Sequence, residues 1–252
     1  MAEKKENRTS DREQSLVQHL LELRRRLLKS LAAVLIVFVG LFHFANDIYI
    51  FISEPLRDKL PAGSTMIATE VTSPFLAPFK LTLVVAFFIV IPFILHQIWA
   101  FISPGLYRHE KRFAIPLLVA SVLLFYLGVS FAYFVISPLI FSFFTSAGPD
   151  SVAMMTDINS YLSFILKLLF AFGIAFEIPV ATVLLIWSGV TSAESLSNKR
   201  PYVVVMCFIV GMLLTPPDVI SQSLLAIPMW LLFEVGIAFS KIIKKTSNTV
   251  LK

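Results

Sequence analysis

The sequence predicts an all-α polytopic membrane protein with six transmembrane helices. Hydrophobic residues make up 57% of the chain, whereas soluble domains are about half apolar. The mean hydropathy of the chain is +0.83. From Leu27 onward most apolar runs have about 18 residues or more, enough to cross a hydrocarbon core of about 30 Å. Basic residues gather between these runs, so the net charge of +5 indicates membrane orientation and not nucleic-acid binding.

The six predicted spans form one transmembrane domain, residues 15–240, between a mobile N-terminus, 1–14, and a tail, 241–252. The last two spans are unusually short. The predicted spans cover about residues 27–44, 75–101, 113–144, 161–187, 201–214 and 219–239.

The first element, Ser15–Lys29, is predicted to be an amphipathic helix that continues into the first span. Ser15 and Gln18 are spaced as a capping box, which places the helix start there. Leucines at helical spacing form one face, and Glu22 lies on the polar face. The helix therefore carries a carboxylate to the membrane surface.

A structured loop is predicted after the first span, from Asn46 to Ser73. Ile48, Ile52 and Leu56 recur at helical spacing and indicate a short interfacial helix, while residues 64–72 indicate extended chain.

The middle spans carry prolines or exceed the length of a perpendicular crossing. Pro78 and Pro92 predict kinks in the second span. The third span is long, so we expect tilt or a bent end. Pro179 lies inside the fourth span beside Glu177.

The distribution of lysine and arginine predicts that both termini are cytoplasmic. These residues concentrate in the N-terminal segment, in 107–112, in 191–200 and in the tail. The opposite connections hold only Arg57 and Lys59. This arrangement satisfies the positive-inside rule.

Two carboxylates, Glu22 and Glu110, fall on the cytoplasmic side in this topology. A carboxylate can accept the two parallel donors of a guanidinium, so the pair suits a cationic peptide arriving from the cytoplasm. The alternative is that Glu22 pairs with Arg26 four residues on, and Glu110 with Lys111 or Arg112. Spacing alone leaves both interpretations open.

Glu177 lies deep in the fourth span, where an ionisable group is costly unless it is paired or protonated. Lys167 is about 15 Å away along the axis and on another face, so we expect it to snorkel outward. Glu177 is either a functional group or a protonated carboxyl bonded to a neighbouring helix. Thr215 and Gln222 similarly bracket the final turn as a polar site or as ordinary loop residues.

Motifs typical of enzymes are missing from the sequence. It has no phosphate-binding loop, no zinc-protease helix and no nucleophile elbow, and its four histidines are scattered. We therefore expect no catalytic activity, no metal and no cofactor. A single cysteine, Cys207, excludes an intramolecular disulfide.

Several longer motifs resemble the TatC family, the multispanning core of the bacterial twin-arginine protein translocase. These motifs follow one another in order from about Leu16 to Ser240. The whole set is more specific to the family than any single motif. The matching pieces are HLLELRRR (19–26), FAND (44–47), STMIATE (64–70), SPF (73–75), LYRHE (106–110), AFGIAFEIP (171–179), KRPY (199–202) and LTPPD (214–218).

The resemblance implies a receptor for twin-arginine signal peptides of folded precursors. It implies that Glu22 and Glu110 contact the signal peptide, that Phe101 leads to this site, and that Glu177 is the family's intramembrane glutamate. It also implies that the region of Met212, Thr215 and Gln222 docks the single-span TatB and TatA partners.

The architecture and location that the resemblance implies are a concave, glove-like bundle of six helices in the bacterial inner membrane. Further copies of the chain join the complex, and the proton motive force drives transport. The alternative is a small-solute or ion transporter with Glu177 and Lys167 along its path, against which the spans show no internal repeat. A structural scaffold is the third interpretation.

Overall fold

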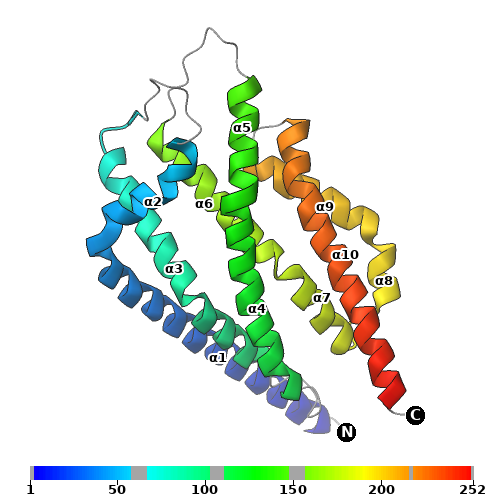
Figure 1. Ribbon diagram of the computed structural model, residues 1–252. Coiled ribbons are helices and arrows are strands. Elements are labelled where there is room, and N and C mark those ends of the chain that lie inside the picture. Colours follow the sequence, from blue (N-terminus) through cyan, green and yellow to red (C-terminus); the bar gives the residue numbers. More distant parts are fainter. Residues whose placement is uncertain (1–2, 58–66, 103–110, 148–156, 216–217, 251–252) are drawn as a thin grey trace. The chain divides into compact units, whose positions relative to one another are not determined.

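The computed structural model describes residues 3–57, 67–102, 111–147, 157–215 and 218–250 (Figure 1). Within these ranges the regular structure is helical, joined by short turns such as 68–72 and 188–192, with one isolated bridge between Ile67 and Asp157. The chain divides into two compact units: residues 1–43 with 82–118, and residues 44–81 with 119–252.

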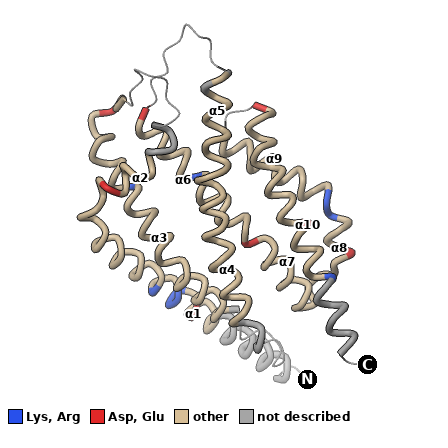
Figure 2. The backbone as a smooth tube through the Cα atoms, in the orientation of Figure 1, with Lys and Arg blue, Asp and Glu red and all other residues tan. Residues whose placement is uncertain are grey.

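Apolar helices make up nearly all of both units, and charged residues are sparse along them (Figure 2). Five helical segments are long and apolar enough to cross a membrane, and α9 is a shorter apolar helix. They cover 17–53, 73–101, 115–144, 158–187 and 219–241, with α9 at Arg200–Leu214. The predicted all-α polytopic fold is confirmed for the described residues. The first apolar helical segment, 17–53, is longer at both ends than the predicted span 27–44.

The first unit is built on α1 (Glu3–Leu41), the second part of α3 (Ser73–Ile102) and the start of α4 (Lys111–Phe131). Its small core contains Val34 of α1 packed on Ala86 and Val90 of α3. α1 begins 12 residues before the predicted start at Ser15. No proline or glycine interrupts residues 3–15, so nothing there breaks the helix.

The second unit contains α2 (Ala45–Arg57), the first turns of α3, the rest of α4, and η3 (Ala132–Ile136) with α5 (Ser137–Ala147). Its remaining helices are α6 (Ile158–Ala175), α7 (Ile178–Trp187), α8 (Ala193–Asn198), α9 and α10 (Val219–Val250). α10 packs against both α7 and α9. The core of the second unit includes Leu162, Ile165, Leu168, Phe172, Leu225 and Ile237, all at most 2% exposed.

Glycine allows close contact between helices of the second unit. A Cβ on Gly128 of α4 would lie 2.5 Å from the Phe172 carbonyl oxygen of α6. One on Gly236 of α10 would lie 2.9 Å from the Pro179 Cα of α7. Only a residue without a side chain fits at these contacts.

Two prolines mark the places where the long spans change their helical geometry. Before Pro138, the Ser137 backbone N–H reaches the carbonyl of Ala132, five residues back, and η3 is a π-helical turn. Before Pro179 the helix stops at Ala175 and restarts at Ile178. A proline ring clashes with the carbonyl four residues earlier, which accounts for both breaks.

A helix, α2, is present where a short interfacial helix was predicted, and other helices of the second unit hold it in place. The Tyr133 hydroxyl donates to the Phe51 carbonyl at 2.7 Å, and the Tyr161 hydroxyl donates to the Ile52 carbonyl at 3.3 Å. The first loop is therefore structured where it is described. Residues 64–66 of the predicted extended stretch lie outside the described ranges.

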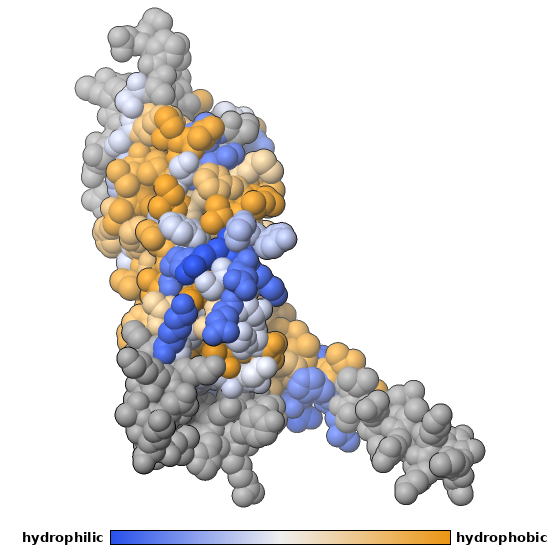
Figure 3. All heavy atoms as spheres, turned by 90° about the vertical axis from the view of Figure 1, so that its right-hand side faces the viewer, coloured by the Kyte–Doolittle hydropathy of each residue, from blue (hydrophilic) through white to orange (hydrophobic). Residues whose placement is uncertain are grey.

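Hydrophilic and apolar surfaces separate along the second unit. Figure 3 shows a hydrophilic patch at α8 and the start of α9, with apolar surface beyond it. Glu194, Asn198, Lys199 and Arg200 are exposed in this patch. Arg200 Nε and Nη2 donate to the two carboxylate oxygens of Glu234, at 2.6 and 2.7 Å, which joins α9 to α10.

Candidate functional site

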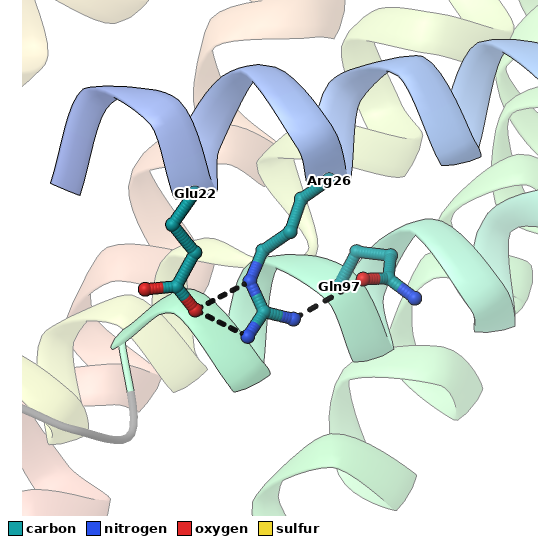
Figure 4. A network of polar contacts seen from close by, with 3 residues as sticks. All are labelled: Glu22, Arg26 and Gln97. Carbon is teal, nitrogen blue, oxygen red and sulfur yellow. Dashed lines mark hydrogen bonds and ion pairs between the residues drawn. The ribbon is translucent and has the colours of Figure 1, made fainter. Parts of the chain in front are cut away.

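The polar face of α1 holds a three-residue network around Glu22 (Figure 4). Arg26 Nε and Nη2 both donate to Glu22 Oε1, at 3.0 and 2.5 Å. Arg26 Nη1 donates to Oε1 of the buried Gln97 on α3, at 3.2 Å. The pair that the sequence analysis gave as the alternative for Glu22, with Arg26 four residues on, is present in the structure. The contribution of Gln97, 71 residues from Arg26, has no signal in the sequence.

Glu22 keeps part of its carboxylate accessible. Its side chain is 38% exposed, against 23% for Arg26. Within the described residues no hydrogen bond uses Oε2. A second donor can therefore approach Glu22 while Arg26 stays in place, or it can replace Arg26.

A hollow of about 410 Å³ lies beside Glu22 and is lined by basic residues. Its lining residues are Gln18, Leu21, Glu22, Arg25, Arg26 and Lys29. Glu22 is the one acid among them, so a cationic ligand at this place meets a single attractive charge among three repulsive ones. Binding there depends on a direct contact with Glu22, because the net local field is unfavourable.

Phe101 lies in the same unit, at the end of α3. Its ring stacks on the His19 ring of α1, with centroids 4.2 Å apart and an interplanar angle of 23°. The stack lies one helical turn before Glu22 on α1. Glu110, the other predicted carboxylate, lies outside the described residues, and so does the rest of 103–110.

Glu177 is at the break between α6 and α7, as the N-cap residue of α7. Its Oε1 is buried and has no hydrogen-bond partner among the described residues. The Ser121 side chain of α4 lies beside the carboxyl group. Pro179 interrupts the helix here, so the sequence signal for this site is the pair Glu177 and Pro179.

The predicted docking residues differ in accessibility. Met212 is 52% exposed on α9, and Gln222 is half-buried on α10. Thr215 is buried, and its hydroxyl donates to the Gly211 carbonyl at 2.9 Å. Of the three, Met212 presents the most surface to a partner.

Asp157 is a polar residue that the sequence analysis did not single out. It caps α6: Oδ2 accepts from the Ser160 N–H at 2.9 Å, and Oδ1 accepts from the Thr69 N–H and hydroxyl at 3.1 and 2.8 Å. These bonds, the Ser160 N–H first, lower its pKa from 3.8 to about 2. The sequence signal was the spacing of Asp157 and Ser160, typical of an N-cap.

Metal-ligating side chains do not gather anywhere in the described ranges: no three His, Cys, Asp or Glu residues are placed to hold an ion.

The family model for Sec-independent protein translocase protein (TatC) matches residues 18–228. The chain is 64% identical over 230 residues to a Sec-independent protein translocase protein TatC of Azotobacter chroococcum, covering 91% of this chain and 90% of that protein. It is 58% identical over 228 residues to the TatC protein of Escherichia coli K12, covering 90% and 88%. A crystal structure of a twin arginine translocase receptor, TatC, superposes with a TM-score of 0.80 at 41% identity, covering 89% of this chain and 98% of that one.

Proposed function

The chain belongs to the TatC family of Sec-independent protein translocase proteins, and from that premise we propose that it is the signal-peptide receptor of a twin-arginine translocase. It binds the paired arginines of folded precursors at the cytoplasmic face of the bacterial inner membrane and nucleates the translocation complex, which the proton motive force drives. The match to a twin arginine translocase receptor over 89% of the chain carries this proposal.

Glu22 supplies the guanidinium contact, and Arg26 occupies its place in the absence of a signal peptide. The two Arg26 bonds to Glu22 Oε1 resemble those that an incoming arginine would make. The exposed pair is held by about 0.2–1 kcal/mol. A contact to a charged group in a covered site is worth about 1.5–3 kcal/mol, so the ligand displaces Arg26 when its binding shields Glu22 from water.

Gln97 makes this exchange reversible. Gln97 Oε1 accepts a hydrogen bond from Arg26 Nη1 at 3.2 Å. Arg26 therefore keeps this partner when Glu22 binds the ligand. Arg26 therefore returns to Glu22 when the signal peptide leaves. Glu110 is the second carboxylate of the proposed clamp, and Phe101, stacked on His19, is its apolar border.

Glu177 offers a polar contact within the bilayer to the apolar part of the signal peptide or to a partner helix. Its unpartnered Oε1 supports this role, because a buried oxygen without a hydrogen bond gains free energy when a donor arrives. Met212, Thr215 and Gln222 form the docking region for single-span partners of the TatA and TatB type, and further copies of the chain complete the assembly.

A small-solute or ion transporter is not favoured. Its path would have joined Glu177 to Lys167, yet the pocket that Lys167 lines does not include Glu177.

The test is co-purification of a twin-arginine signal peptide with the full chain from membranes. The twin-arginine peptide should co-purify, and its twin-lysine variant should be retained at least about tenfold less, because lysine cannot make the bidentate contact. Equal recovery of the two peptides would contradict the proposed receptor function.

A further inference from the structure

A polar pocket of about 410 Å³ lies in the second unit, where α6 begins and α9 ends. It is formed by the segment before α3, one face of α6 and the last residue of α9. The lining residues are Thr69, Glu70, Asp157, Asn159, Ser160, Ser163, Phe164, Lys167 and Leu214. The proposed signal-peptide site is in the other unit, so the proposed function assigns nothing to this pocket.

The pocket holds one carboxylate and one ammonium that are available to a ligand. Asp157 is committed to Thr69 and Ser160 by three hydrogen bonds. Glu70 makes one long bond, 3.3 Å from Asn159 Nδ2 to its Oε2. Lys167 is exposed and makes no ion pair or hydrogen bond within the part of the chain that the structure describes.

Ser163 adds a directed donor next to Lys167. Its hydroxyl oxygen accepts from Lys80 Nζ at 2.8 Å. The hydroxyl proton is therefore left for an acceptor in the pocket, and the Lys80 charge lies just behind it. Ser163 and Lys167 are one helical turn apart on the same face of α6. This end of the pocket suits an oxyanion.

The two charges are ordered along α6. Glu70 lies at the start of this helix, because Thr69 is bonded to Asp157 and Asn159 Nδ2 donates to Glu70 Oε2. The Lys167 Cα is about 14 Å of helix rise further along the candidate span 158–187. Lys167 therefore lies deeper along the span than Glu70.

We propose that this pocket binds the headgroup of a phospholipid that carries a primary ammonium, with its phosphate on Lys167 and Ser163 and its ammonium on Glu70. In such a lipid the phosphate is next to the glycerol and the ammonium is further out, which is the order of Lys167 and Glu70. A phosphatidylethanolamine headgroup fits this description. A choline headgroup has no N–H to donate to Glu70, and a glycerol headgroup has no cation.

The experiment measures lipid retention by the full chain, purified from nanodiscs with equal parts phosphatidylethanolamine, phosphatidylglycerol and phosphatidylcholine. Wild type should retain phosphatidylethanolamine in excess over the other two. Lys167→Gln and Glu70→Gln should each lower that retention about tenfold, because each removes one charge-assisted contact. Lys167→Arg keeps the charge and should retain the lipid.

Lys241→Gln is the matched control, because Lys241 is an exposed lysine of α10 outside the pocket. It should retain phosphatidylethanolamine like wild type, and each variant should elute as wild type does in detergent. Equal retention of phosphatidylglycerol by wild type, or unchanged retention by Lys167→Gln, would overturn the proposal. Displacement of the lipid by millimolar glycerophosphoethanolamine would support the proposal, because this molecule carries the same phosphate and primary ammonium.

Discussion

Arg26 competes with the ligand for Glu22 in our account, so removing it should strengthen binding. Arg26→Gln removes both bonds to Glu22 Oε1 and one of three repulsive charges around it. Since the pair is worth about 0.2–1 kcal/mol, signal-peptide affinity should rise up to about fivefold. Titration of a labelled twin-arginine peptide against the purified variant measures this effect.

Arg25→Gln is the control for charge alone. Arg25 lines the same hollow but makes no described bond to Glu22. Its substitution should raise affinity less than that of Arg26. An affinity loss in Arg26→Gln would instead identify Arg26 as a residue that positions Glu22.

The Asp157 cap should make stability depend on pH in the acid range. Its pKa is lowered from 3.8 to about 2 in the folded chain, so its contribution is present above pH 3.8 and is lost as the pH falls toward 2. The difference in unfolding temperature between wild type and Asp157→Asn in detergent should be constant above about pH 5 and shrink below pH 4. A difference that persists at pH 2 would show that the carboxylate charge is not its origin.

At the residue scale, local spacing predicted more than distant contacts. The Glu22–Arg26 pair follows from positions four apart on one helix. Gln97 beside Arg26 and Ser121 beside Glu177 come from other helices, and a single sequence carries no signal for which helices adjoin. The second carboxylate, Glu110, stays a prediction.

At the element scale, α4 and α6 pack closely only because residue 128 has no side chain. Gly128→Ala would place a Cβ 2.5 Å from the Phe172 carbonyl oxygen and 2.9 Å from the Phe176 Cβ. The helices must move apart, which should cost about 1–3 kcal/mol. Thermal unfolding of the purified chain in detergent measures this loss.

Gly40→Ala is the matched control on α1, where no atom lies within 4 Å of the new Cβ. Alanine gains about 0.5–1 kcal/mol over glycine within a helix, so this variant should be as stable as wild type or more so. If Gly128→Ala were equally stable, the contact between α4 and α6 would not depend on glycine.

The sequence did not indicate which prolines interrupt a helix. Pro78 and Pro92, where kinks were predicted, lie within the uninterrupted helix α3. Pro179 and Pro138 mark the breaks because proline lacks an N–H and displaces the carbonyl four residues earlier. The chain forms a π turn before Pro138, whereas before Pro179 one helix ends and the next begins. The choice depends on neighbouring contacts, such as the bond from the Ser137 hydroxyl to the Ala132 carbonyl.

At the scale of the whole molecule, hydropathy predicted a chain of long apolar helices, because a bilayer fixes the length that an apolar helix needs to cross it. Helix ends outside the bilayer were harder to predict from the sequence. α1 begins at Glu3 and α10 continues to Val250, since water imposes no fixed length and no breaker interrupts either end.

The proposed orientation predicts opposite labelling of two exposed positions. In a Cys207→Ala background, Val71→Cys should react with a membrane-impermeant maleimide on intact cells, because Val71 is 100% exposed and lies before α3. Asn198→Cys, in the basic stretch between α7 and α9, should react only after the membrane is opened. The reverse pattern would invert the topology and move Glu22 away from the cytoplasm.

In the proposed receptor, the Glu22 carboxylate recognises an arginine of the signal peptide. A double-mutant cycle tests it most directly, with wild type and Glu22→Gln each titrated with twin-arginine and twin-lysine peptides. We predict that wild type prefers the twin-arginine peptide by at least about tenfold and that Glu22→Gln loses most of this preference. A preference of the same size in Glu22→Gln would contradict the claim, whatever the change in overall affinity.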